Sequence, residues 1–212
     1  MKSGSRPHPR VLLAEGSDDM NVAIHILKAH GIENETVWVI DIKGNTNLRK
    51  VLSVELKSSV LESIGILLDA EIDVNARWQS ISDTLSLHGY TLPHQAPQIG
   101  GAVLAPVKGI AVGAWVMPDN TSAGMLEHFI NKLVRSDDDL WQDSVEAVAR
   151  VIDSGKHRFP LDHRIKAELN TWLAWQKEPG INYGIAIKEN YLDPKCGPGI
   201  EFFDWMKRLF TL

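Results

Sequence analysis

Short apolar runs alternate with helix-like segments along the first half of the chain. The strand-like runs are 11–14, 36–42 and 64–69. Apolar residues then recur at helical spacing over 18–30, 47–60 and 75–88. Strands that alternate with helices of this length predict a mostly parallel sheet with right-handed crossover connections.

The pattern changes in the second half. Glycines punctuate the apolar runs between 98 and 117, which predicts a hairpin and one more strand of the sheet. Helical spacing then recurs over 124–134, 140–152, 162–175 and 199–209. We therefore predict an α/β fold in which helices flank a mostly parallel central sheet. The predicted parts are a flexible leader (1–10), an α/β core (11–135) and a mainly helical C-terminal extension packed on that core (136–212).

Two patterns in the helical part predict structural roles. The acidic run 137–139 suits a solvated turn whose last acid, Asp139, caps the following helix. Trp172, Trp175 and Trp205 stand at helical spacing with Leu and Phe, which favours packing in a core over stacking on bases.

Charge is distributed unevenly along the 212 residues. The formal net charge of -5 argues against a protein that coats nucleic acid by charge alone. Residues 1–155 hold 13 Lys/Arg and 20 Asp/Glu, whereas residues 156–212 hold 9 and 7. The acidic excess belongs to the α/β half, and bound metal ions would offset part of it, so phosphate substrates stay possible.

Cysteine content and hydropathy bear on the compartment. Cys196 is the only cysteine, so no disulfide can form within the chain. This favours a cytoplasmic protein. The longest apolar stretch, 110–117, is too short to span a bilayer, so no membrane association is expected.

Acidic side chains gather where the first strand meets its helix. Glu15 ends the strand, Gly16 permits a sharp turn, and Asp19 follows in the first turn of the helix. Helix capping explains Asp18 and Asp19 equally well. A glutamate at the end of an apolar strand does not stabilise the strand, however, so Glu15 favours a ligand site.

The third predicted strand, like the first, ends in acidic residues. Asp69 and Glu71 alternate and so face the same way, with Cβ atoms roughly 6–7 Å apart, and Asp73 follows on the loop. If the first and third strands are neighbours, these carboxylates crowd the edge where open α/β sheets bind ligands. Such crowding is costly unless a cation neutralises it. Oxygen ligands without Cys or His favour Mg²⁺ or Mn²⁺, which suit phosphodiester cleavage or phosphoryl transfer.

These motifs resemble a known domain. The Glu-Gly-x-x-Asp element from Glu15 to Asp19, followed by a strand ending in Asp69 and Glu71, resembles the Toprim domain of topoisomerases, bacterial primases and OLD-family nucleases. Nearly the whole chain also resembles a small, uncharacterised bacterial family of stand-alone Toprim-like proteins. The segments that carry this second likeness are 68–71, 75–81, 115–120, 124–129 and 172–175.

The resemblance implies roles for the acids. Glu15 would be a general acid/base or a metal ligand, and Asp69 and Glu71 would bind Mg²⁺. Glu71 departs from the family pattern, which has an aspartate there. Asp19 would help to hold a second metal ion, and Glu127 stands where OLD-like nucleases place another acid.

Several of these residues have a structural explanation as well. Lys166 matches the basic residue near the site of OLD-like nucleases, but a surface lysine packed over tryptophans fits equally. Glu127 suits a solvent-facing helix position. Arg77 could grip a phosphate or pair with Asp73. Asp119, with its neighbour in sequence, fits a turn as well as a site.

The combined prediction is a Toprim-type, Mg²⁺- or Mn²⁺-dependent nuclease that acts on nucleic acid, with DNA favoured over RNA. Glu15, Asp69 and Lys166 would be catalytic; Glu15, Asp19, Asp69, Glu71, Asp73 and Glu127 would bind metal; Arg77 would bind phosphate. No tyrosine stands in the setting of a covalent topoisomerase step. No Gly-x-x-x-x-Gly-Lys loop occurs, so any ATPase partner would be a separate chain.

Two other functions stay open. The protein could be a non-catalytic Toprim-like module that binds or regulates a separate ATPase, or an enzyme for nucleotides or other small phosphates. The acidic charge and the lack of a basic groove favour the module, whereas Glu15 and Asp69 oppose it. A homo-oligomer is compatible with each of these functions.

Overall fold

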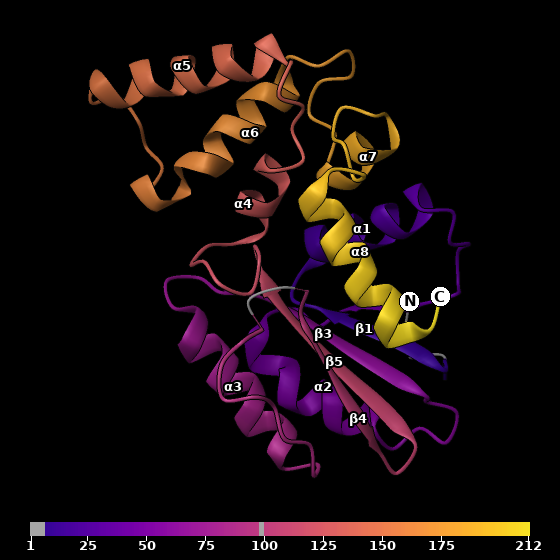
Figure 1. Cartoon of the computed structure of the whole chain (residues 1–212). Coiled ribbons are helices and arrows are strands. Elements are labelled where there is room, and N and C mark those ends of the chain that lie inside the picture. Colours follow the sequence, from indigo (N-terminus) through magenta and orange to yellow (C-terminus); the bar gives the residue numbers. More distant parts are fainter. Residues whose placement is uncertain (1–6, 98–99) are drawn as a thin grey trace.

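The computed structural model describes residues 7–97 and 100–212, and its centre is a five-stranded sheet (Figure 1). The strands are β1 (Arg10–Ala14), β2 (Trp38–Asp41), β3 (Ser63–Asp69), β4 (Ala102–Val107) and β5 (Ile110–Met117). Their order is β2-β1-β3-β5-β4, and all pairs are parallel except β4 with β5. The predicted α/β class and mostly parallel sheet are therefore confirmed.

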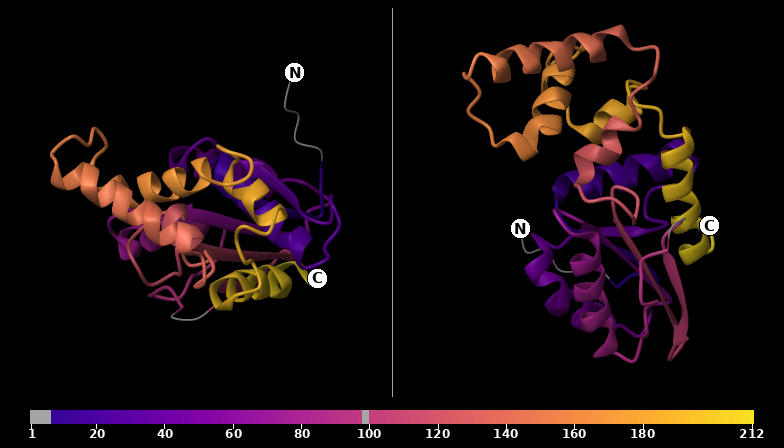
Figure 2. Two further views of the ribbon diagram at one scale, coloured as in Figure 1. Left: turned by 90° about the horizontal axis from the view of Figure 1, so that it is seen from above. Right: turned by 60° about the vertical axis from the view of Figure 1, so that its left-hand side comes forward.

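Helices cover both faces of this sheet (Figures 1 and 2). The helices α1 (Ser17–Ala29) and α8 (Gly197–Phe210) lie on one face, and α2 (Leu48–Glu55) and α3 (Val74–Ser86) lie on the other. Strand side chains alternate between the two resulting cores, as pleated strands require. Leu12, Leu67 and Trp115 belong to the core under α1 and α8, whereas Leu13, Ile66 and Val116 belong to the core under α2 and α3.

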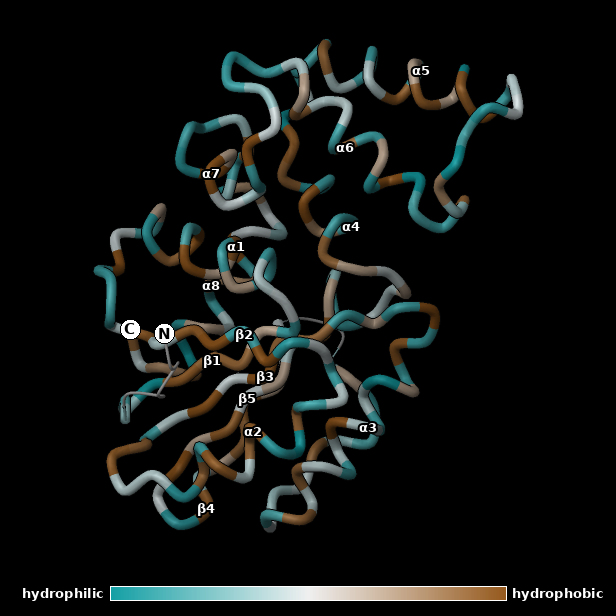
Figure 3. The backbone as a smooth tube through the Cα atoms, turned by 180° about the vertical axis from the view of Figure 1, so that it is seen from behind, coloured by the Kyte–Doolittle hydropathy of each residue, from teal (hydrophilic) through white to brown (hydrophobic). Residues whose placement is uncertain are grey.

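The remaining helices form a cap beyond the carboxyl ends of the parallel strands. They are α4 (Leu126–Asn131), α5 (Asp139–Asp153), α6 (Arg164–Ala174) and α7 (Tyr183–Lys188), and the short 3-10 turn η2 (Leu161–His163) leads into α6. A second 3-10 turn, η1 (Asn45–Asn47), leads into α2 outside the cap. The α5–α6 pair projects away from the sheet (Figure 2). Hydrophobic residues concentrate along the sheet and hydrophilic ones along the peripheral loops (Figure 3). In the described part of the chain, no helix has the length and apolarity to cross a membrane.

Several predicted boundaries move. Helix α2 ends at Glu55, before the predicted end at 60, because the amides of Lys57 and Ser58 close a turn on the carbonyls of Val54 and Glu55. The six-residue helix α7 was not predicted. Strand β1 already begins at Arg10, inside the predicted leader. Residues 1–6 of that leader and 98–99 of the predicted hairpin region lie outside the described residues.

Two predicted structural roles need correction. Asp138, not Asp139, caps α5, because its Oδ1 accepts a hydrogen bond from the amide of Trp141 at 3.2 Å. Trp172 and Trp205 are fully buried as predicted, but Trp175 is 45% exposed. Trp175 follows the last residue of α6, where the chain leaves the packed helix face.

Two glycines on adjacent central strands let α8 approach the sheet. Gly65 of β3 pairs with Gly113 of β5. A Cβ at Gly65 would lie 2.8 Å from Leu12 Cδ1 and 3.1 Å from Leu209 Cδ2, and a Cβ at Gly113 would lie 2.7 Å from Leu209 Cδ2. These distances are too short for carbon atoms, so α8 can pack here only over positions without side chains.

Candidate functional site

The carboxyl ends of β1 and β3 bring the first two candidate acids into contact. The strands are adjacent and parallel, with Ala14 opposite Leu67. The amide of Glu15 donates to the Leu67 carbonyl at 3.1 Å. The amide of Asp69 donates to Oε2 of Glu15 at 3.0 Å, across 54 residues of sequence. The predicted meeting of Glu15 and Asp69 at one sheet edge is therefore confirmed.

Asp19 lies in the first turn of α1, directly beside this edge. Its Oδ2 accepts a hydrogen bond from the Gly16 amide at 3.1 Å, and its side chain folds over the start of the helix. The residue is only 6% exposed, and its Oδ1 is buried with no hydrogen-bond partner in the described structure. Helix capping therefore accounts for one oxygen of Asp19 and leaves the other unexplained.

Burial and mutual repulsion change the ionisation of the two aspartates. Burial, followed by the negative charges of Asp19, Glu15, Glu127 and Glu71, raises the pKa of Asp69 to about 9. Burial and the charge of Glu15 raise the pKa of Asp19 to about 7, although backbone hydrogen bonds oppose this rise. The Oδ1 of Asp69, like that of Asp19, is buried without a hydrogen-bond partner among the described residues. Without a cation, at least one of these carboxyl groups is protonated at neutral pH.

Helices α4 and α6 add an ion pair to the acidic edge. Glu127, in the first turn of α4, is 4% exposed, so it does not face solvent as one interpretation held. Its Oε1 lies 3.0 Å from Nζ of Lys166 on α6. The hydrogen bond to Glu127 raises the pKa of Lys166, and the charges of Asp18 and Asp69 add to the effect. Lys166 therefore stays positively charged beside the acids and does not pack merely as a surface lysine.

A short backbone bridge connects the end of β3 to the start of α4. Glu71 and Gly124 exchange two backbone hydrogen bonds of 2.7 Å, and Glu71 has a left-handed φ of 58°. The Glu71 side chain is exposed, but its charge contributes to the raised pKa of Asp69. The bridge fixes the loop that carries Glu71 next to the segment that leads to Glu127.

Asp73 and Arg77 lie at the start of α3 and differ in their relation to the site. Asp73 caps the helix, because its Oδ1 accepts hydrogen bonds from the amides of Asn75 and Ala76 at 2.9 and 3.1 Å. The Arg77 side chain donates through Nε to the backbone carbonyl of Asp69 at 2.6 Å, and only the Arg77 backbone amide donates to Asp73, at 3.1 Å. Arg77 therefore borders the acids, whereas the exposed Asp73 carboxylate has a structural explanation.

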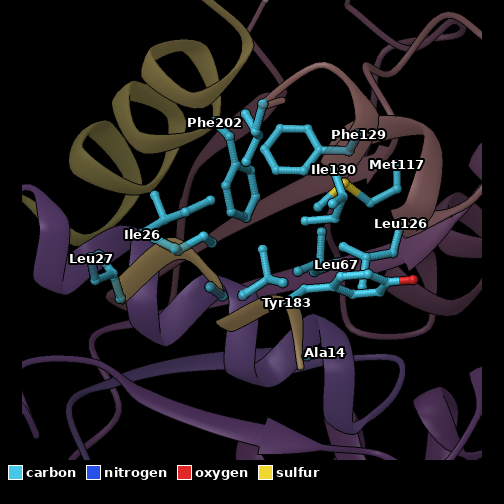
Figure 4. Close-up of a cluster of buried hydrophobic side chains, with 14 of the residues drawn as sticks. Ala14, Ile26, Leu27, Leu67, Met117, Leu126, Phe129, Ile130, Tyr183 and Phe202 are labelled. Carbon is cyan, nitrogen blue, oxygen red and sulfur yellow. The ribbon is translucent and has the colours of Figure 1, made fainter. Parts of the chain in front are cut away.

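Tyr183, the first residue of α7, was not among the predicted site residues. Its ring belongs to the hydrophobic cluster under α1, and its hydroxyl points out of that cluster (Figure 4). Burial, followed by the charges of Glu127 and Asp18, raises the pKa of Tyr183, so the phenol is neutral. No sequence pattern pointed to this residue, because the helix that carries it has only six residues.

The donors at this edge fit a hard divalent cation, although they are not fully assembled. With the side chains as they stand, no group of three or more Asp, Glu, His or Cys residues in 7–97 and 100–212 could hold a metal ion. The two unpartnered buried oxygens belong to carboxylates, the ligand type that Mg²⁺ and Mn²⁺ prefer. Binding would therefore require at least one nearby carboxylate to turn towards Asp19 and Asp69.

Comparison with known proteins adds a family without a described activity. Residues 9–211 match the family described as "Protein of unknown function (DUF3226)". The match spans nearly all of the described chain and includes every acid of the sheet edge. No curated protein and no solved structure matches the chain.

Proposed function

The chain belongs to the DUF3226 family, whose function is unknown, and we propose from its site that it cleaves or transfers phosphodiester bonds of nucleic acid with the help of Mg²⁺ or Mn²⁺. The observation that carries this proposal is the pair of buried, unpartnered carboxylate oxygens on Asp19 and Asp69, next to Glu15. Such atoms destabilise a fold unless something binds them. Strongly shifted carboxyl groups of this kind are typical of functional sites.

Glu15, Asp19 and Asp69 would be the metal ligands, because their side chains lie together at the sheet edge. Glu71 and Glu127 flank them. A divalent cation bound there lowers the pKa of a water molecule and stabilises charge on phosphoryl oxygens. The Asp69 amide holds Oε2 of Glu15, so the orientation of the Glu15 carboxylate is fixed before any ligand arrives.

Two residues from the helical cap support an anionic substrate. The Lys166 side chain is 47% exposed while it pairs with Glu127, so its charge reaches both the acid and the solvent. This position allows Lys166 to attract a phosphate towards an edge that is otherwise negative. Tyr183 contributes a neutral hydroxyl close enough to Glu127 for that acid to raise its pKa, and this hydroxyl can donate a hydrogen bond.

The connection between α5 and α6 supports a polymeric substrate. Segment 156–166 contains four Lys/Arg residues and one acid, Asp162. Lys156 and Arg158 are exposed and form no ion pair within the described residues. The segment overhangs the same side of the molecule as α3 in Figures 1 and 3. Exposed cations near such a site are suited to the phosphates of a strand that extends past the acids.

Exposed apolar side chains near the same side also favour a polymer over a small phosphate. Ile72, between Glu71 and Asp73, is 92% exposed, and Leu161 at the start of η2 is also exposed. Apolar side chains in such positions can contact bases of a nucleic acid. The proposed substrate is therefore a nucleic acid strand, and DNA is the first choice for the assay.

One observation favours the second candidate, a non-catalytic module that partners a separate ATPase. No three acids are grouped to hold a cation without movement in the described part of the chain. In such a module, Asp69 and Asp19 would serve the packing of β3 against α1 or hold an ion without catalysis. This function predicts no turnover and no loss of any activity on substitution of the acids.

A cleavage assay with isosteric variants tests the proposal. Single- and double-stranded DNA and RNA would be incubated with Mg²⁺ or Mn²⁺ and with wild type, Glu15→Gln or Asp69→Asn. Glu62→Gln, an exposed acid next to β3, is the matched control. We expect metal-dependent cleavage that falls by about 10²–10³-fold in both site variants, the cost of removing one electrostatic catalytic group, and stays unchanged in the control.

Calorimetry with Mn²⁺ separates the candidates when cleavage is absent. Mn²⁺ binding that disappears in Asp69→Asn, without cleavage of any polymer, would favour the module. Phosphate release from nucleotides without polymer cleavage would indicate that the substrates are small phosphates and not nucleic acid. Cleavage that survives both Glu15→Gln and Asp69→Asn would refute the assignment of the site.

A further inference from the structure

A basic pocket lies at the opposite end of α1 from the acids. Lys28 follows Asp19 by nine residues, which is about 13 Å along a helix that rises 1.5 Å per residue. The pocket is formed by the last turns of α1 and α7 and by the segments near 135 and 190–195, and its volume is about 470 Å³. This volume lies in the range of small-molecule sites.

Cations dominate the lining of the pocket. Lys28, Arg135, Lys188 and Lys195 surround it, and Asp193 is its only acid among the described residues. Within those residues, Lys188 pairs with Glu189 at 3.0 Å, whereas the other three cations form no ion pair. The pocket is therefore positive in a chain whose formal net charge is -5.

Helix dipoles explain only part of this charge. Lys28 and Lys188 stand in the last turns of α1 and α7, where basic residues stabilise helix ends. Arg135 and Lys195 lie outside helices, so the dipole explanation does not apply to them. The single acid is engaged locally, because Oδ1 of Asp193 accepts the Lys195 amide at 2.9 Å. Lys28, Arg135 and Lys195 thus lack a paired acid among residues 7–97 and 100–212.

A histidine in the wall responds to these cations. Burial, followed by the charges of Lys28 and Lys188, lowers the pKa of His25. The imidazole is therefore neutral at neutral pH and can donate or accept a hydrogen bond. Both lysines line the pocket together with His25.

The walls of the pocket are held in place before any ligand binds. Gly184 of α7 packs so closely on α1 that a Cβ there would lie 2.8 Å from His25 Cδ2 and 3.0 Å from the Asn21 carbonyl oxygen. The Asp193 amide donates to the Leu133 carbonyl at 2.8 Å, and a ring nitrogen of His30 lies 3.2 Å from the Pro194 carbonyl oxygen. A preformed site loses less entropy on binding than a flexible one.

We propose that this pocket binds a small phosphate-bearing anion of about nucleotide size. Converging cations match the multiple charges of a phosphate, and the guanidinium of Arg135 can bind two phosphate oxygens at once. The half-buried Ala29 and the buried Ile187, Leu192 and Pro194 also line the pocket, so part of its wall is apolar. The site is separate from the acidic edge and needs no metal ion.

Calorimetry in EDTA tests the proposal, because EDTA removes the divalent cations through which the acidic edge would bind a phosphate, and the pocket variants leave Lys166 in place. The probes are inorganic phosphate, pyrophosphate and a nucleoside monophosphate at low salt. The test variant is Lys28→Glu with Arg135→Glu, and the control is Lys50→Glu, an exposed lysine on α2. We expect wild type and control to bind at least one probe equally, and the double variant to bind it at least about tenfold more weakly.

The possible results separate cleanly. Tighter binding of the monophosphate than of phosphate assigns the apolar surface to the nucleoside; equal binding assigns the site to the phosphate group alone. No binding by wild type, or equal binding by the double variant, overturns the pocket and leaves the cleavage proposal untouched. Lys195→Ala, in an exposed turn, replaces the double variant if the latter melts at a lower temperature.

Discussion

The neighbouring strands β3 and β5 each lead to an aspartate at the same sheet edge, yet the two aspartates differ in every relevant property. Asp119, two residues after β5, accepts hydrogen bonds from Thr121, Ser122 and Lys132. Although burial raises its pKa, those hydrogen bonds lower the pKa of Asp119 well below its usual value. Asp69, the last residue of β3, has an unpartnered oxygen and a pKa raised to about 9.

The difference shows what distinguishes a structural acid from a candidate functional one. Asp119 serves its own turn, and its neighbour Asn120 does the same, because Oδ1 of Asn120 accepts the Val116 amide at 2.8 Å. The turn interpretation of Asp119 is therefore confirmed. Asp69 has a carboxylate that the fold does not use, and an external ligand is the simplest physical reason to keep one buried.

The largest expected effect is a difference in cleavage rate between the Asp→Asn variants of Asp69 and Asp119. We predict that Asp69→Asn lowers metal-dependent cleavage by about 10²-fold or more, whereas Asp119→Asn leaves the rate within about twofold. Cleavage rates at saturating Mg²⁺ measure both. Equal losses in the two variants would break the comparison, because Asp69 would then act through the fold alone.

The second effect concerns the two lysines that pair with acids. Lys166→Met removes the partner of buried Glu127, and we predict a rate loss of about tenfold, with Lys166→Arg restoring most of it. Lys132→Met removes the partner of Asp119 and should leave the rate unchanged. A rate loss as large in Lys132→Met as in Lys166→Met would contradict the assignment of Lys166 to the substrate.

The contributions of Asp69 and Asp119 to the pH dependence of stability should have opposite signs. The folded-state pKa values of Asp69 and Asp19 lie above the ordinary value of 3.8, so folded protein without metal binds more protons than unfolded protein. Its stability must therefore fall as the pH rises from about 4 to 9. For Asp119, whose pKa is lowered, the contribution is present above the ordinary value and is lost in acid.

Melting temperatures in EDTA at pH 5 and pH 8 check this prediction. Asp69→Asn should melt at least about 2–4 °C above wild type at pH 8, the shift that 1 kcal/mol produces in a protein of this size. The difference should shrink at pH 5, and Mn²⁺ should stabilise wild type but not the variant. A variant that melts below wild type at pH 8 would show that the Asp69 carboxylate does not destabilise the metal-free protein.

The smallest effect distinguishes the cap of α3 from a metal ligand. Asp73→Ala should lower the free energy of unfolding by about 1 kcal/mol, because two helix amides lose their acceptor. Asp73→Asn keeps an acceptor oxygen and should be nearly neutral. Chemical denaturation measures both changes. Loss of cleavage in a stable Asp73→Asn variant would instead indicate that Asp73 is a metal ligand.

The sequence was sufficient for the parts of the site that depend on periodicity. Glu15 and Asp69 each end an apolar run, and parallel strands place such ends at one edge. Because β1 and β3 are adjacent, Glu15 and Asp69 are in contact. The sheet itself was predictable for the same reason, since buried strands and amphipathic helices differ in period.

The rest of the site depends on docking that no local pattern encodes. Glu127 and Lys166 lie 39 residues apart on α4 and α6, and each fits a surface position when its helix is considered alone. Tyr183 lies on a helix of six residues, too short for a clear periodic signal. The unpartnered oxygens of Asp19 and Asp69 depend on which groups the fold places around them, so no sequence pattern predicts them.

The glycine pair under α8 has a consequence for biosynthesis. All five strands precede α8 in the chain, and Leu209 seals the space over Gly65 and Gly113. During translation, that patch of β3 and β5 therefore stays open to water until residues 197–210 have left the ribosome. We expect nascent chains that stop short of α8 to be prominent chaperone clients, since the helix that covers their apolar face has yet to be made.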